Sequence, residues 1–299
     1  MKLLASVALF ASWAAAPVCA AQMTITVEPS AKNFAAPSNL APNDLKLSAR
    51  SARLPVLGLD RLPADQSDVQ LFIVLDDSTR SGALSVQLPE LKRWVEGLPA
   101  GEQVAVGYIR NGAVNLAEAF TTDHAKAAGA LRLPEAIAGV NGSPYFAIDS
   151  VARHWPATNP GARRALLLFT DGVDRYYTDP RIIDDPYVDG AVDSALKSHI
   201  AVYTVYLRGE GSYGTTDWQI TMAQSRLLQV SRETGGFAYQ DTLSNPVSIA
   251  PYLSDFSLRL ANQYRVTFQA ANRQGFQPVT LKTELPHVKI AAPARVYVQ

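Results

Sequence analysis

Apolar residues gather into four nearly continuous runs between residues 69 and 207. The runs are VQLFIVL at 69–75, QVAVGYI at 103–109, RALLLFT at 164–170 and IAVYTVYL at 200–207. Strands that are covered on both faces of a sheet have continuous apolar sequences rather than an alternation of apolar and polar residues. The four runs therefore predict the central strands of a buried sheet.

Segments with helical spacing of apolar residues alternate with these strands. We expect helices over residues 83–97, 144–155, 188–198, 217–234 and 247–261. AVNLAEAF, which follows Asn111-Gly112, predicts a short hairpin strand, because this dipeptide favours a two-residue turn. The alternation predicts an α/β fold with a doubly wound, mostly parallel, Rossmann-like sheet and right-handed crossovers.

The two flanks of the chain have a different pattern. Residues 21–68 are rich in Pro, Ala and Ser and contain the alternating pieces TITVEP and LKLSAR. Residues 263–299 contain QYRVTFQA, PVTLKTEL and ARVYVQ, which predict antiparallel strands. Neither flank has enough strands to bury a face alone. We therefore expect a small β appendage, made by both flanks, beside an α/β domain at residues 69–262.

Residues 1–20 have the features of a secretory signal peptide. Lys2 precedes an apolar run that ends in small residues, which predicts cleavage near Ala20 and a secreted or periplasmic protein. The run is too short for a membrane span, so we expect no membrane insertion. Cys19 is the one cysteine of the sequence. A lipoprotein with lipid on Cys19 is an alternative, but Val18 is larger than such sites usually tolerate.

Charge and composition narrow the class of function. The 27 Lys and Arg balance 27 Asp and Glu without any basic run, which argues against nucleic-acid binding. GEGSYG at 209–214 matches the G-x-G-x-x-G spacing of dinucleotide sites. Arg208 and Glu210 would crowd a phosphate there, so we interpret the segment as a flexible connector. We expect no enzymatic activity, with an NAD-dependent oxidoreductase as a disfavoured alternative.

Carboxylates and hydroxyls occupy three loops next to the predicted strands and helices. LFIVLDDSTRSG supplies Asp76 and Ser78, NGSPYFAI supplies Ser143, and RALLLFTDGVD supplies Asp171 and Asp174. In an open parallel sheet the functional crevice lies beyond the carboxyl ends of the strands. Oxygen ligands that meet there suit a hard cation such as Mg²⁺.

FIVLDDSTR, NGSPYFAI and LLLFTDGVD, in this order, resemble the three loops of the von Willebrand factor type A (VWA) domain and its metal-ion-dependent adhesion site. LLQVSRETGGFAY is similar to the helix, Gly-Gly pair and strand that close that domain. The flanking segments resemble, more narrowly, the acidobacterial-type subgroup. The resemblance covers roughly residues 69–260. It implies a VWA-type fold and a protein-binding or adhesion function, in which a ligand carboxylate completes the metal shell.

The resemblance implies metal ligands residue by residue. The first loop of the family has the pattern Asp-x-Ser-x-Ser, which Asp76 and Ser78 match, while Arg80 stands at the last serine position. Ser143 supplies the hydroxyl of the second loop, and Asp171 matches the aspartate of the third. A guanidinium about 5 Å from a divalent ion costs roughly 6 kcal/mol of repulsion at a dielectric constant near 20. We therefore expect a degenerate site with weak binding of Mg²⁺ or Mn²⁺.

Alternatives remain open at these loops. A shift of register by one residue gives Asp77, Thr79 and Ser81 as ligands. Arg80 could instead neutralise Asp76 and Asp171 in place of an ion, or hold the carboxylate of a ligand. In the plainest interpretation these residues only cap the following helix and satisfy loop amides.

The acidic and aromatic segment DRYYTDPRIIDDPYVDG follows the third loop directly. Tyr and Arg are favoured anchors of protein interfaces, and a solvated loop is the alternative. The candidate partner-binding residues are Arg80, Asp174, Arg175, Tyr176 and Tyr177. We expect an exported binding module for a protein ligand. A structural or assembly component of the cell envelope, without metal, is the competing hypothesis, and the oligomeric state is left open.

Overall fold

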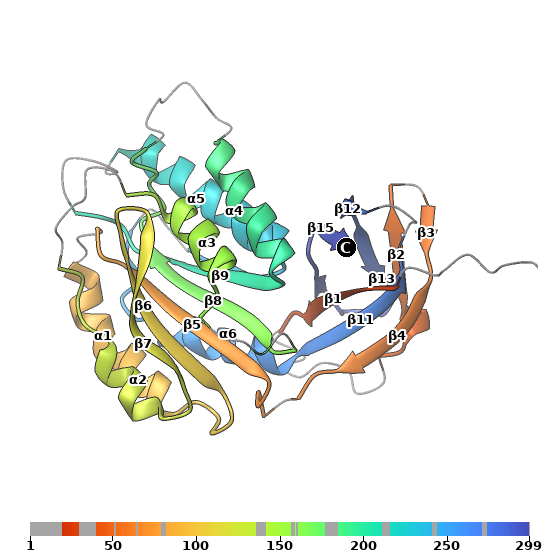
Figure 1. The fold of residues 1–299 in the computed structure, drawn as a ribbon, viewed down its shortest axis with the longest axis horizontal. Coiled ribbons are helices and arrows are strands. Elements are labelled where there is room, and N and C mark those ends of the chain that lie inside the picture. The colour runs from red at the N-terminus through yellow and green to blue at the C-terminus, as the bar shows by residue number, and fades with distance from the viewer. Residues whose placement is uncertain are drawn as a thin grey trace, which may run out of the picture.

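The computed structural model describes residues 20–29, 40–50, 52–63, 65–78, 82–135, 142–156, 159, 161–176, 185–210, 216–240, 244–270 and 274–298. An α/β part with one large sheet packs beside a β appendage, as Figure 1 shows. None of the helices in these ranges is long and apolar enough to cross a membrane.

A six-stranded sheet forms the centre of the α/β part. Its strands are β5 (Val69–Asp76), β6 (Gln103–Arg110), β7 (Ala113–Thr121), β8 (Arg163–Thr170), β9 (Ile200–Tyr206) and β10 (Ala238–Tyr239). The strand order is β10-β9-β8-β5-β6-β7, and all neighbours are parallel except β6 and β7. Asn111 and Gly112 join this antiparallel pair with positive φ angles of 52° and 71°, as a tight hairpin turn requires.

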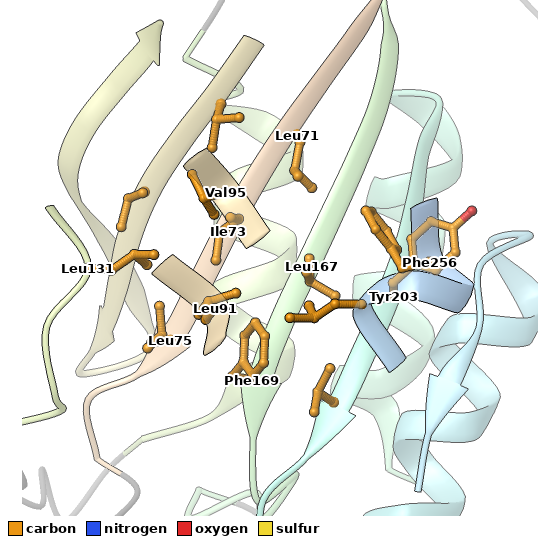
Figure 2. Close-up of a cluster of buried hydrophobic side chains, with 14 of the residues drawn as sticks. Leu71, Ile73, Leu75, Leu91, Val95, Leu131, Leu167, Phe169, Tyr203 and Phe256 are labelled. Carbon is orange, nitrogen blue, oxygen red and sulfur yellow. The ribbon is translucent and has the colours of Figure 1, made fainter. Parts of the chain in front are cut away.

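In the described part of the chain, three helices cover each face of the sheet. They are α1 (Gly82–Glu96), α2 (His124–Ala130) and α6 (Ala250–Ala261) on one face, and α3 (Pro144–Arg153), α4 (Pro186–Lys197) and α5 (Asp217–Glu233) on the other. Leu71 and Ile73 of β5 lie on the first face with Leu91 of α1, as Figure 2 shows. Phe72 and Val74 lie on the second face with α3 and α4. This two-sided burial is the reason why β5 has an unbroken apolar sequence.

Helix α2 was not predicted from the sequence. Its residues HAKAAGA are small and carry no helical period of large apolar side chains. The signal that was present is Asp123, whose side chain caps the helix by accepting a hydrogen bond from the Lys126 amide. The predicted start of the last helix was three residues too early, because α6 begins at Ala250 rather than at residue 247.

Both flanks of the chain build the appendage, which confirms that part of the predicted fold. Strands β1 (Ala20–Val27) and β4 (Val56–Arg61) pair with opposite edges of β11 (Gln263–Gln269), and β14 (Ile290–Ala291) pairs with β1. Next to η1 (Pro42–Asp44), β2 (Leu45–Ala49) lies between β3 (Ala52–Leu54) and β13 (Thr280–Thr283), and β12 (Gly275–Pro278) pairs with β15 (Arg295–Val298). The appendage has its own apolar core, which includes Ile25, Leu47 and Phe268.

Arg163 joins the two parts. Its guanidinium is buried and forms an ion pair with Asp68, with 2.8 Å between Nε and Oδ1. It also donates hydrogen bonds to the carbonyls of Pro63 and Leu260 and to the side chain of Gln263. Its partners therefore come from the segment before β5, from helix α6 and from β11 of the appendage.

Candidate functional site at the carboxyl end of the sheet

Asp76 ends strand β5 and is buried. Its Oδ1 accepts hydrogen bonds from the amide and the hydroxyl of Ser78, at 3.0 and 2.6 Å. Its Oδ2 accepts a hydrogen bond from Thr170 Oγ1, at 2.7 Å, on the neighbouring strand β8. Both carboxylate oxygens are therefore engaged, one by the loop after β5 and the other by the last residue of β8.

Asp171 follows β8 and is 1% exposed. Arg175, four residues later, donates from Nη2 to Oδ2 at 2.7 Å and from Nη1 to Oδ1 at 3.3 Å. Burial raises the pKa of Asp171, the Arg175 guanidinium opposes the rise, and the negative charge of Asp76 adds to it. Asp76 and Asp171 are thus close enough to repel each other, and Arg175 supplies the compensating positive charge.

Ser143 is the N-cap of helix α3. Its Oγ accepts a hydrogen bond from the Phe146 amide and donates one to Asp174 Oδ2, at 2.8 Å. The Arg175 amide donates to the carbonyl of Gly142 at 2.9 Å. These contacts join the second and third loops. The hydrogen bonds of the Ser143 hydroxyl are therefore made to groups of the protein itself.

Gly209 and Glu210 belong to the site, although the sequence suggested only a connector there. A Cβ atom on Gly209 would lie 2.7 Å from Asp171 Oδ2. Glu210 Oε1 accepts a hydrogen bond from the Gly82 amide, at 2.6 Å, at the start of α1. The available sequence signal was Gly209 itself, since glycine permits close approach of the backbone to another group.

Asp77 is engaged elsewhere, which argues against the shifted register of ligands. Its buried carboxylate accepts hydrogen bonds from Arg110, from Arg132 and from the amide of Glu135. Burial raises the pKa of Asp77, but the hydrogen bonds from Arg132 and Arg110 outweigh it and bring the pKa below its ordinary value. Thr79, Arg80, Ser81 and Tyr177 lie outside the described residues.

The arrangement of Asp76, Ser143 and Asp171 in the structure does not fit a divalent ion. Within the described ranges, no group of three or more His, Cys, Asp or Glu is placed to hold a metal. Asp76 is engaged by Ser78 and Thr170, and Ser143 by Asp174. Asp171 already has a cationic partner. Metal binding here would require Arg175 to leave Asp171.

Exposed apolar side chains are concentrated at this end of the sheet. Eight large hydrophobic residues are exposed in the described part of the chain. Five of them lie in or beside the loops at the carboxyl ends of the strands: Val86, Leu133, Tyr176, Trp218 and Val247. A contact between α1 and the loop before α6, from Gln87 to the Pro246 carbonyl, brings the neighbouring Val86 and Val247 to the same region. We call these five residues the apolar rim.

No protein-family model and no curated protein matches the chain. Among solved structures, an aerotolerance-related membrane protein from Bacteroides fragilis is 18% identical with a TM-score of 0.44, covering 64% of this chain and 98% of that one. The VWA domain of SpRpn10 is 13% identical with a TM-score of 0.42, covering 63% and 93%. The pilus adhesin SpaC from Lactobacillus rhamnosus GG is 10% identical with a TM-score of 0.48, covering 84% and 46%.

Among the described residues, Asp76, Ser143 and Asp171 lie at the carboxyl end of a mostly parallel six-stranded sheet that has three helices on each face. This architecture is the α/β fold with a mostly parallel sheet that the sequence predicted, and the VWA-type assignment rests on the ordered loop motifs. Identities and TM-scores at this level indicate nothing about a shared ligand or partner. The acidobacterial-type subgroup stays a prediction from the sequence.

Proposed function

We propose that this chain is a binding module, not an enzyme, and that a protein ligand docks on the apolar rim at the carboxyl end of the VWA-type sheet. The observation that carries the proposal is the gathering of exposed apolar side chains around buried, internally satisfied polar loops. Apolar groups that cluster on an exposed surface mark interaction sites far better than single exposed residues do.

The aromatic residues of the rim are suited to anchoring a partner. Tyr176 is 45% exposed, and its ring packs edge-on against Phe146, with 5.0 Å between ring centroids. Phe146 in turn lies 4.3 Å from the ring of Tyr187. Trp218 is 46% exposed in the first turn of α5. The Tyr176 ring is held by Phe146 and so loses little entropy on binding, and Tyr and Trp are both enriched among the residues that dominate binding energy.

Metal has at most a minor part in this proposal. Arg175 neutralises Asp171, so the affinity for Mg²⁺ or Mn²⁺ is expected to be weak. A contact between Arg80 and a ligand carboxylate, and export guided by residues 1–20, are further parts of the proposal that rest on the sequence. The competing function is a structural or assembly component, which the internal satisfaction of Asp76, Ser143 and Asp171 favours.

Affinity capture of envelope proteins with residues 21–299 tests the proposal. The paired variants Trp218→Ser and Tyr176→Ser should each lose the captured partner, because each removes an exposed anchor. Leu228→Ser, on the same helix as Trp218 but outside the rim, and Leu57→Ser, in the appendage, are the matched controls and should keep the partner. Capture unchanged by chelator is expected. Equal capture by all four variants would exclude the rim as the docking surface.

A further inference from the structure

A cleft of about 240 Å³ lies at the opposite end of the sheet from the apolar rim. It is bounded by the first residues of β8 and β9 on one side and by β1, β11 and β15 of the appendage on the other. Figure 1 shows these appendage strands beside the central sheet. Ligand pockets occur preferentially where two such parts meet.

The charged side chains that line this cleft are all arginines, because burial and the neighbouring Arg164 lower the pKa of His199 and favour its neutral form. The basic lining residues are Arg163, Arg164, His199, Arg265 and Arg295, and no described Asp or Glu lines the cleft. Arg163 is neutralised by Asp68. Arg295 forms ion pairs with Asp193 and Glu233. Arg164 and Arg265 form no ion pair with any described residue.

Arg164 carries unsatisfied hydrogen-bonding capacity. Its Nε atom is buried without a hydrogen-bond partner in the described structure. Its Nη1 reaches only the Ser198 carbonyl at 3.3 Å, and the guanidinium lies 5.7 Å from the centroid of the Trp155 ring. Burial lowers the pKa of Arg164, and no acidic group offsets this. Arg164 is half-buried, and a partly desolvated guanidinium without a counterion costs free energy that a bound anion would recover.

Arg265 reaches the same cleft from the appendage. It lies on β11 between Thr24 of β1 and Asp60 of β4, its cross-strand neighbours. Asp60 is exposed and, among the described residues, makes no ion pair with Arg265. The two arginines therefore approach one cavity from two different parts of the protein.

We propose that this cleft binds a small oxyanion, a phosphate or a carboxylate, between Arg164 of the α/β part and Arg265 of the appendage. The planar guanidinium fork matches the spacing of two oxygens on such an anion. The anion would bridge the two parts and stabilise their junction by mass action. This site is independent of the rim and of the function proposed for it.

Titrations of residues 21–299 with inorganic phosphate and with citrate test the proposal. We expect a saturable rise of the thermal midpoint with one or both anions, and none with sodium chloride at equal ionic strength. A response to citrate alone identifies a carboxylate site, and a response to phosphate alone identifies a phosphate site. The absence of any saturable response up to about 10 mM, an affinity limit of roughly 3 kcal/mol, overturns the proposal.

Variants that remove one charge each test whether the anion binds at Arg164 and Arg265. Arg164→Gln and Arg265→Gln should each weaken binding by about tenfold or more, as measured by calorimetry, because each removes a charge-assisted hydrogen bond. Arg93→Gln, an exposed position on α1, makes the same change of net charge and should bind as the wild type does. Arg164 and Arg265 are both half-buried, so both variants should fold, and the unfolding midpoint of each anion-free variant checks this. Wild-type affinity in Arg265→Gln overturns the proposal.

Discussion

Arg175 forms a two-pronged ion pair with Asp171, and both residues belong to the loop that follows β8. The sequence assigned Arg175 to partner contact and offered Arg80, among several alternatives, as an internal cation for Asp76 and Asp171. Its side chain is only 13% exposed, so Arg175 offers little surface to a partner. Asp171, which the sequence resemblance implies as a metal ligand, therefore has its counterion built into the chain.

Arg175→Gln should convert this loop into a better metal site. Without the guanidinium, Asp171 is a buried carboxylate beside Asp76, and the metal-free variant should lose roughly 3–5 kcal/mol of stability. Wild-type affinity for Mg²⁺ should be about millimolar, and a gain of about 3 kcal/mol would tighten it on the order of a hundredfold. Calorimetric titration measures the affinity, and urea denaturation with and without Mg²⁺ measures the recovery.

Arg80→Ser, measured in parallel, decides which arginine repels the ion. If Arg175 is the relevant cation, Arg80→Ser changes metal affinity far less than Arg175→Gln does. Asp171→Ala added to Arg175→Gln should abolish the recovery by Mg²⁺. Micromolar affinity of the wild-type protein would show that Arg175 leaves Asp171 readily, contrary to the arrangement described above.

Gly209→Ala should destabilise the protein, because the new Cβ atom would lie 2.7 Å from Asp171 Oδ2. Relieving this overlap requires movement of the loop or of Asp171, at a cost of about 1–3 kcal/mol. Gly190→Ala is the control: the added Cβ meets nothing within 4 Å in helix α4. That change should stabilise the protein by about 0.5–1 kcal/mol. Chemical denaturation of both variants measures the difference, and a neutral Gly209→Ala would show that the loop does not press on Asp171.

The sequence was sufficient to predict strands that are buried on both faces and turns that depend on neighbouring residues alone. The apolar run of β5 and the Asn111-Gly112 turn depend on short-range chemistry, and both were predicted. Helix α2 was missed because its small residues carry no period. The partner of Asp171 was missed for another reason. Which of two arginines folds back onto a carboxylate depends on the path of a loop, and loop paths are set by tertiary packing rather than by local propensity.

Residues 69–262 alone should be markedly less stable than residues 21–299. This truncation removes Pro63, Asp68 and Gln263, which are all the partners of the buried Arg163 guanidinium except the Leu260 carbonyl. A buried charge without its counterion costs several kcal/mol, roughly 3–5 when one partner of a buried pair is removed. Residues 63–263 keep these partners but lack the appendage strands β1 and β4. The thermal midpoints of the three chains therefore separate the effect of losing the Arg163 ion pair from the effect of losing the appendage. Equal midpoints for all three chains would show that neither loss destabilises the protein.

Glu102 should make the stability of the protein depend on pH. It is 0% exposed, and neither of its carboxylate oxygens has a hydrogen-bond partner within the described structure. Burial raises its pKa from 4.5 to about 8, although the charge of Arg163 opposes the rise. The folded protein then holds a proton that the unfolded chain releases above pH 4.5. The contribution of Glu102 to stability is therefore fully present below pH 4.5 and is lost as pH rises through about 8.

Glu102→Gln tests this directly, because glutamine resembles the protonated carboxyl and does not titrate. Each unit of pKa difference corresponds to about 1.4 kcal/mol, so the loss of wild-type stability across the window from pH 4.5 to 8 amounts to roughly 3–5 kcal/mol. The variant should lose much less over the same range, and its advantage over the wild type should grow with pH. Glu96→Gln, at an exposed position of α1, is the control and should follow the wild-type curve.

Urea denaturation from pH 5 to 8.5 measures the stability of all three proteins. Parallel curves for Glu102→Gln and the wild type would mean that Glu102 is ionised in the folded state, and that water or a movement of the strand start supplies the solvation that burial removes.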